Sequence, residues 1–191
     1  IAQNEACTGQ SPVNYWMHAN MLTLNGKKMA KSTGNNILPR ELITGENSIL
    51  RKAFSPSVAR FFMLQAHYRS ILDFSDDAIV AAEKGYNRMM EALQNLKDIQ
   101  PETNSSLDIH AWRKNCYEAM NDDFNSPILI AQLFEGVRFI NLLKEKMATL
   151  TEADLFLFST TINSFIYDVL GLDAEKKSND SDVKLSGVVE M

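Results

Sequence analysis

The stretch "SDDAIVAAEKGYNRMMEALQNL", residues 75–96, decides the fold class of this chain. Apolar residues recur every seven positions in two interleaved series: Ile79, Tyr86 and Leu93, and Ala82, Met89 and Leu96. Such a pattern places one apolar stripe on a long helix that packs nearly parallel or antiparallel to a neighbour. Ser75 is a candidate N-cap, and Asp76 and Asp77 follow where the helix dipole favours negative charge.

Helical spacing continues in three further segments downstream. The faces that they would bury are Ile109, Trp112, Cys116 and Met120; then Leu129, Leu133, Ile140, Leu143 and Met147; then Leu155, Phe158, Ile162, Phe165 and Val169. Thr151 and Asp154 have the spacing of a capping box, and Gly171 fits a helix stop. Residues 75–171 therefore predict four antiparallel helices with short links.

Upstream of the bundle the pattern changes to strands and loops. In "MLTLNGKKMAKSTGNN", residues 21–36, the Asn25-Gly26 pair predicts a β-hairpin, because a type I′ turn needs positive φ at both central residues. Helices are then predicted to begin at Pro39 and at Pro56, with Ser55 as the N-cap of the second. The predicted fold is mainly α, with a short hairpin and loop ahead of a helical bundle.

The bulk composition narrows the class of protein. The 191 residues are 45% hydrophobic, which is enough for a core, and no run of about 18 apolar residues predicts a membrane span. Cys7 and Cys116 are far apart and fit no disulfide or metal spacing, so we expect reduced thiols in a cytosolic protein. The chain opens on Ile1 rather than Met, and we expect an excised piece of a longer protein.

Charge is unevenly distributed along the chain. Residues 1–70 hold eight basic and three acidic residues, whereas the remainder holds 11 basic and 21 acidic ones. A basic N-terminal part suits a polyanion such as a nucleotide or an RNA backbone. The acidic remainder argues against a protein that coats nucleic acid along its whole length.

The residues best placed for chemistry are Lys28, Lys31 and Ser32, in the loop after the hairpin. Two lysines three positions apart on a loop can converge on one anionic group, and a lysine is a mobile point charge suited to phosphate. The hydroxyl of Ser32 and the backbone beside Gly34 add donors. By these residues alone, an exposed basic loop that binds nothing is the favoured interpretation.

Three separated motifs carry a resemblance to a known family. "KMAKS", residues 28–32, resembles the Lys-Met-Ser-Lys-Ser signature of class I aminoacyl-tRNA synthetases, with Ala30 in place of the first serine. "YWMHANMLTLNGKKMAKSTGNNI" (residues 15–37), "FFMLQAHYRSILDFSDDAI" (61–79) and "MNDDFNSP" (120–127) together resemble cysteinyl-tRNA synthetase. The resemblance covers most of residues 1–172.

The resemblance implies an activity and its participants. In that family the signature loop closes over ATP, with its magnesium, while cysteinyl-adenylate forms, so Lys31 would bind the nucleotide and Lys28 and Ser32 would support it. Cysteine and tRNA(Cys) would be the other substrates. The family's His-Ile-Gly-His motif is absent from this sequence, and the ligands of the family's zinc lie outside it. A cytoplasmic, monomeric enzyme is expected, and this piece alone is expected to be inactive.

The same resemblance suggests how the chain divides. Residues 1–36 would be a remnant of the catalytic domain with the signature loop, and residues 37–74 a helical region that contacts the tRNA stem. Residues 75–172 would be the DALR-type bundle and residues 173–191 a flexible tail, with mobility expected at 178–182. Without the rest of the catalytic domain, residues 1–20 are expected to be poorly packed and the signature loop is expected to be mobile.

Two motifs and two other functions stay open. In "HYRS" (67–70), Tyr68 and Arg69 either lock the junction between loop region and bundle or, through Arg69, contact the tRNA backbone. In "MNDDFNSP", Asp122 and Asp123 either bind a metal or belong to a helix-to-helix turn capped by Asn125 or Ser126. The alternative functions are a cysteine ligase that transfers cysteine to an amino sugar in thiol biosynthesis, and a non-catalytic helical interaction module.

Overall fold

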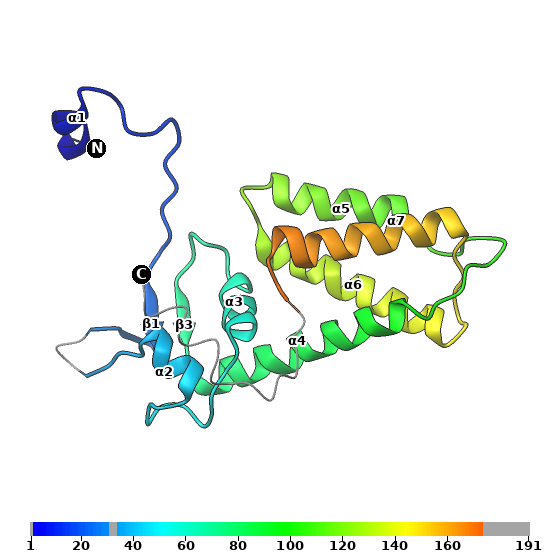
Figure 1. Ribbon diagram of the computed structural model, residues 1–191, viewed down its shortest axis with the longest axis horizontal. Helices are drawn as coiled ribbons and strands as arrows, with labels where there is room; N and C mark the ends of the chain where they lie inside the picture. The colour runs from blue at the N-terminus through cyan, green and yellow to red at the C-terminus, as the bar shows by residue number, and fades with distance from the viewer. Residues whose placement is uncertain (1, 31–33, 174–191) are drawn as a thin grey trace, which may run out of the picture.

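The computed structural model describes residues 2–30 and 34–173 and is mostly helical (Figure 1). Its elements in chain order are α1 (Ala2–Thr8), β1 (Leu22–Leu24), β2 (Lys27–Lys28), α2 (Pro39–Thr44), α3 (Pro56–Leu64), β3 (Leu72–Phe74), α4 (Asp76–Leu96), α5 (Ile109–Asn121), α6 (Ser126–Lys144), α7 (Glu152–Asn163) and the π-helical η2 (Ser164–Val169). The mainly α class with a small sheet is confirmed.

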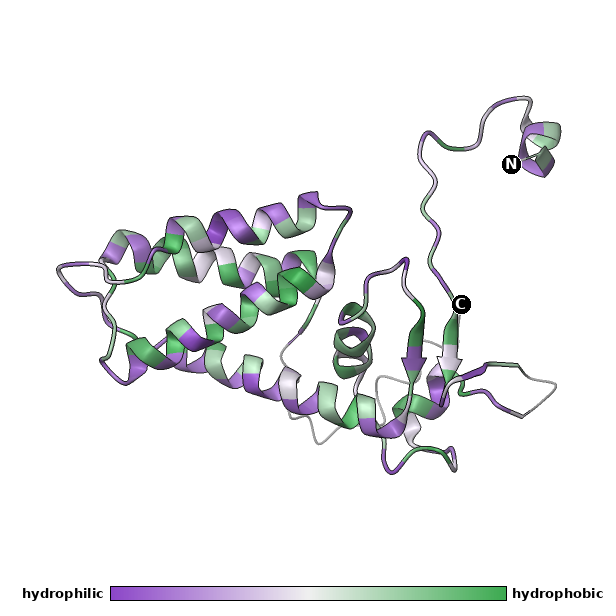
Figure 2. Ribbon diagram, turned by 180° about the vertical axis from the view of Figure 1, so that it is seen from behind, coloured by the Kyte–Doolittle hydropathy of each residue, from purple (hydrophilic) through white to green (hydrophobic). Residues whose placement is uncertain are grey.

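Helices α4 to α7 form the predicted bundle, and their directions alternate along the chain (Figure 1). α6 packs against both α4 and α5, and α5 also packs against α7. Both heptad series of α4 are buried, from Ile79 to Leu96. Ser75 caps α4 by accepting a hydrogen bond from the Ala78 amide, as predicted. Figure 2 shows the alternation of apolar and polar residues that follows from this packing.

Two residues assigned to buried faces are in fact exposed. Met147 is 71% exposed, because α6 ends at Lys144 and the chain turns at Lys146, whose φ is 57°. Val169 is 49% exposed, because η2 has π-helical geometry and each π turn holds more residues than an α turn. The next residue, Leu170, faces the core instead.

Gln132 and Gly136 of α6 show how side chains of α5 and α7 pack against this helix. The indole nitrogen of Trp112 donates to the Gln132 carbonyl at 2.8 Å, which fixes the ring against α6. Phe158 stacks edge-on against Trp112, with ring centroids 4.9 Å apart. Gly136 faces this aromatic pair, and the absence of a side chain there leaves room for both rings.

The hairpin is as predicted, but it belongs to a larger sheet. Asn25 and Gly26 have φ values of 51° and 72°, which the tight turn requires. The sheet order is β2-β1-β3, with β1 antiparallel to β2 and parallel to β3. The sequence analysis did not predict β3. It leads through Ser75 directly into α4, so the hairpin is joined to the first helix of the bundle.

The two ends of the chain fit the expectations only where the structure describes them. Residues 2–11 and 13–21 are exposed, and α1 has no buried residue, which agrees with poor packing of residues 1–20. The predictions for 174–191, including mobility at 178–182, lie outside the described residues.

Among the described helices, α6 is long and apolar enough by composition to cross a membrane, but half of that window is buried inside the fold. A core helix of a folded domain passes the same test, so the observation is weak evidence for a membrane span.

Candidate functional site

The hairpin presents Lys28 at the entrance to the signature loop. Lys28 is the last residue of β2, is exposed, and pairs with Thr23 of β1. The amide of Ala30 donates to the Asn35 carbonyl at 3.1 Å, and the Asn35 side chain donates to the Lys28 carbonyl at 3.2 Å. These bonds close the two ends of the loop against each other. Lys31 and Ser32 lie outside the described residues, so their predicted roles stay predictions.

An open hollow of about 420 Å³ lies at this entrance, lined by Lys27, Lys28, Gly34 and Asn35. Its walls are two ammonium-bearing side chains, an amide side chain, and a glycine with a φ of 68°. None of the four described residues that line it carries a carboxylate, and such a lining suits an anion. Binding of a phosphate by this loop stays a prediction.

Asp73 of β3 holds the turn of this hairpin. Its Oδ1 accepts a hydrogen bond from the Thr23 hydroxyl at 2.5 Å and another from the Gly26 amide at 2.8 Å. The Asn25 amide also donates to the Phe74 carbonyl at 2.9 Å. The bonds from Thr23 and Gly26 favour the ionised carboxylate and lower the pKa of Asp73. Nothing in the sequence singled out Asp73, because its partners Thr23 and Gly26 lie far from it along the chain.

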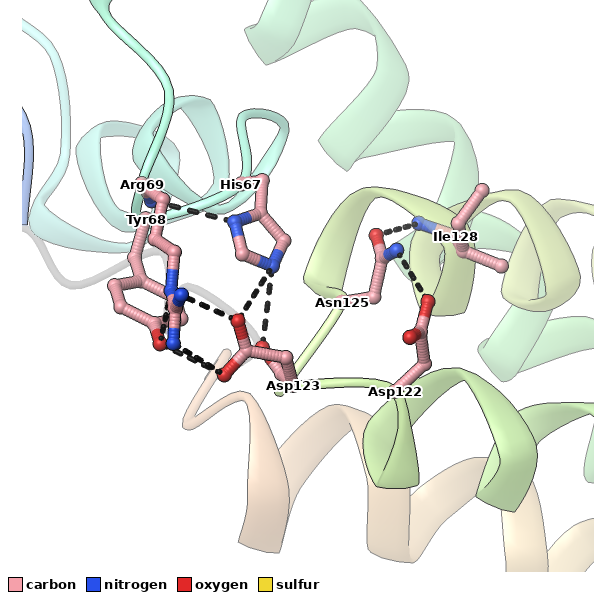
Figure 3. A network of polar contacts seen from close by, with 7 residues as sticks. All are labelled: His67, Tyr68, Arg69, Asp122, Asp123, Asn125 and Ile128. Atoms are coloured by element: carbon pink, nitrogen blue, oxygen red, sulfur yellow. Dashed lines mark hydrogen bonds and ion pairs between the residues drawn. The ribbon is translucent and has the colours of Figure 1, made fainter. Parts of the chain in front are cut away.

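A second polar network joins the region before β3 to the bundle (Figure 3). Asp123, in the turn between α5 and α6, accepts from the Tyr68 hydroxyl at 2.8 Å and pairs with Arg69 Nε at 2.9 Å. Arg69 Nε also donates to the Tyr68 hydroxyl at 2.9 Å, and His67 Nε2 lies 3.1 Å from the Asp123 carbonyl. We call these four residues the HYR–Asp123 clasp.

The clasp is connected to the segment that leads into β1. The Asn20 amide donates to the Tyr68 carbonyl at 2.9 Å, and its side chain donates to the Arg69 carbonyl at 2.8 Å. The structural interpretation of "HYRS" is therefore confirmed, because Tyr68 and Arg69 lock the junction. Hydrogen bonding to Tyr68 and the charge of Asp123 raise the pKa of Arg69, which stays a cation. Contact of Arg69 with tRNA stays a prediction.

The "MNDDFNSP" motif is the predicted helix-to-helix turn. Asn125 caps α6 by accepting from the Ile128 amide, and its side-chain amide donates to Asp122 at 3.1 Å. Asp123 and Phe124 have φ values of 53° and 55°, a left-handed pair that costs free energy in non-glycine residues. Ser126, the other candidate cap, is instead the first residue of α6.

Part of the basic charge of residues 1–70 is used inside the fold. Arg51 pairs with Asp76 at 2.9 Å and with Asp77 at 2.5 Å, at the N-terminus of α4. Lys52 pairs with Glu83 at 2.5 Å. Together with Arg69 in the clasp, these pairs fasten the 37–74 region to the bundle. The basic face open to a polyanion is therefore smaller than the residue count suggests.

Two family models match this chain. The model described as "tRNA synthetases class I (C) catalytic domain" matches residues 1–84, which include the hairpin, the loop and β3. The model described as "DALR domain" matches residues 115–175, which cover the end of α5 and all of α6, α7 and η2.

Relatives of known name agree with both models. A cysteine–tRNA ligase of Parabacteroides distasonis is 48% identical over 179 residues, covering 94% of this chain and 36% of that protein. One of Bacteroides thetaiotaomicron is 48% identical, covering 94% of this chain and 37% of that protein. One of Chlorobaculum tepidum is 43% identical over 141 residues, covering 74% of this chain. The chain thus spans little more than a third of the length of the first two.

Proposed function

Since this chain belongs to the cysteinyl-tRNA synthetase family, we propose that it supplies the nucleotide loop and part of the tRNA-binding surface of a cysteine–tRNA ligase. The observation that carries the proposal is the hairpin-held loop with Lys28 at its entrance, in the segment that the class I catalytic model matches. The substrates of the whole enzyme would be ATP with magnesium, cysteine and tRNA(Cys).

The chemistry proposed for the loop is electrostatic. The cysteine carboxylate attacks the α-phosphorus of ATP in line with the departing pyrophosphate, whose negative charge grows as the bond breaks. Lys31 and Lys28 stabilise that charge, and Ser32 donates a hydrogen bond beside them. Ala30 offers no hydroxyl, so one supporting contact is lost while both positive charges are kept.

The zinc that the resemblance implies does not fit the described residues. Nowhere in residues 2–30 and 34–173 do three or more His, Cys, Asp or Glu side chains gather in a way that would hold a metal. Cys7 is exposed and Cys116 is buried, so they do not form part of one site. We therefore assign no step of the reaction to zinc in this part of the enzyme.

The remaining parts of the proposal concern RNA and organisation. Residues 1–36 form the loop-bearing remnant of the catalytic domain, residues 37–74 the stem-contacting region, residues 75–172 the bundle, and residues 173–191 a tail. Arg69 contacts the tRNA backbone with the part of its guanidinium that the clasp leaves accessible; its side chain is 66% exposed. The enzyme acts as a cytoplasmic monomer away from membranes.

Cysteine-dependent ATP–pyrophosphate exchange tests the proposal. It is measured on a full-length ligase that carries this segment, on its Lys31→Ala variant, and on this chain alone. Lys84→Ala, which removes an exposed lysine of α4, is the matched control. Loss of one group that stabilises transition-state charge lowers the rate by about 10²–10³-fold. We expect that loss for Lys31→Ala, none for Lys84→Ala, and no exchange by this chain alone. Equal rates for both variants would refute the role of the loop.

A further inference from the structure

The hairpin that carries the signature loop makes few packing contacts of its own. β2 is two residues long, and both of its side chains, Lys27 and Lys28, are exposed. β1 is three residues long and is anchored mainly by the fully buried Leu24. A short two-stranded hairpin is marginally stable by itself in water. Other contacts must therefore set the direction in which the loop projects.

Asp73 makes those contacts on the side of the hairpin away from β2. The parallel pairing of β1 with β3 places Thr23 next to Asp73. The carboxylate bonds to the Thr23 hydroxyl in one strand and, at the turn, to the Gly26 amide. One carboxylate oxygen thus ties β1 and the turn to β3. Hydrogen bonds to an ionised acceptor are about twice as strong as neutral ones.

A short chain of contacts leads from this carboxylate to the loop entrance. Thr23 is the ladder partner of Lys28, and the Lys28 carbonyl accepts the bond from Asn35 that closes the loop. In the other direction, Asp73 is followed by Phe74 and by Ser75, the N-cap of α4. The carboxylate therefore stands between the first helix of the bundle and the entrance of the loop.

We propose that Asp73 is a positioning residue for ATP in the ligase, because it fixes the hairpin, and with it the signature loop, on the strand that leads into α4. The proposal rests on the function proposed above. Asp73 touches no substrate; it acts through Thr23 and Gly26. Without it, the hairpin holds Lys28 less firmly at the loop entrance, and ATP is bound in the productive position less often.

The test uses Asp73→Ala, Asp73→Asn and Asp77→Asn in a full-length ligase that carries this segment. Asp77→Asn removes a nearby charge whose ion pair is with Arg51, a residue outside the hairpin. A misplacement of about 1 Å costs a rate factor of about 10². For Asp73→Ala we expect kcat/KM for ATP to fall about tenfold, within that limit, with an unchanged KM for cysteine. Asp73→Asn keeps one acceptor oxygen and should restore part of the loss.

Limited trypsin digestion gives a second readout that does not depend on catalysis. Asp73→Ala should be cut faster between Lys27 and Lys31 than Asp77→Asn, at an unchanged melting temperature for the whole enzyme. Equal cleavage and equal kcat/KM for ATP in these two variants would overturn the proposal. If the unmodified enzyme shows no cysteine-dependent exchange, the proposed function fails instead, and the trypsin comparison still decides whether Asp73 holds the hairpin.

Discussion

Gly136 of α6 lies against side chains of both α5 and α7. A Cβ atom built at this position would lie 3.0 Å from Ile162 Cδ1, 3.1 Å from Trp112 Cζ2 and 3.5 Å from Phe158 Cε2. The first two distances are shorter than ordinary van der Waals contacts, so the neighbours must move. Trp112 has little freedom to do so, because its indole nitrogen is bonded to the Gln132 carbonyl.

Two opposing effects decide the result of Gly136→Ala. Alanine is favoured over glycine inside a helix by about 1 kcal/mol. Overpacking of a well-packed core costs about 1–3 kcal/mol. Because two aromatic or aliphatic neighbours are displaced at once, we place the cost near the middle of that range. The net expectation is a loss of about 1 kcal/mol in the free energy of unfolding.

Gly85→Ala in α4 is the matched control. The Cβ atom there would lie 3.4 Å from both Phe134 Cζ and Phe61 Cε1, which is ordinary contact. The helix-propensity gain should then dominate, and the variant should gain up to about 1 kcal/mol. Urea unfolding followed by circular dichroism measures both variants in this chain. If Gly136→Ala is as stable as Gly85→Ala, the account of packing between α5, α6 and α7 is wrong.

Three further predictions concern charge, thiols and the clasp. Hydrogen bonds to Asp154, chiefly the one from Ser105, lower its pKa below 3.8, so the stability that this carboxylate contributes is present above pH 3.8 and is lost as the pH falls through the lower pKa of the folded state. The difference in free energy of unfolding between Asp154→Asn and the unmodified chain should therefore shrink on acidification. A difference that stays constant with pH in urea unfolding would contradict this. Burial raises the pKa of Cys116 to about 12. At pH 8 a thiol reagent should therefore label the exposed Cys7 at once and Cys116 only after denaturation. Rapid labelling of both thiols would show that the bundle is open. Asp123→Ala loses the clasp and keeps a left-handed backbone that alanine disfavours, so it should lower the free energy of unfolding by about 2 kcal/mol. Asp123→Gly loses the same clasp but should cost about 1 kcal/mol less, because glycine tolerates that backbone. Equal stabilities of the two variants would refute the role of the backbone.

The helical bundle was predictable because its signals are local. The heptads of α4, the caps Ser75 and Asn125 and the Asn25-Gly26 turn each act within a few residues, where propensity and periodicity are decisive. The π-helical end of the bundle left no such signal, and one extra residue in the turn exposed Val169 in place of Leu170.

The supports of the candidate site were harder to predict, because they join residues that are far apart in sequence. β3 has three residues, too few for a periodic signal, and Asp73 lies 50 positions from Thr23. Similarly, 54 positions separate Arg69 from Asp123, so the sequence offered only alternatives for both motifs. Lys28 was found from its spacing to Lys31, the resemblance implied its role, and the structure places it at the loop entrance.

The central claim, that this chain is part of a ligase that charges tRNA with cysteine, is tested most directly by the identity of the acceptor. A full-length enzyme carrying this segment is incubated with ATP, labelled cysteine, and either tRNA(Cys) or an amino sugar. We predict that label is transferred to the tRNA alone, and that Lys31→Ala slows the transfer by about 10²–10³-fold. Transfer to the amino sugar would identify a ligase of thiol biosynthesis, and transfer to neither would leave a helical module without catalysis; both results contradict the account.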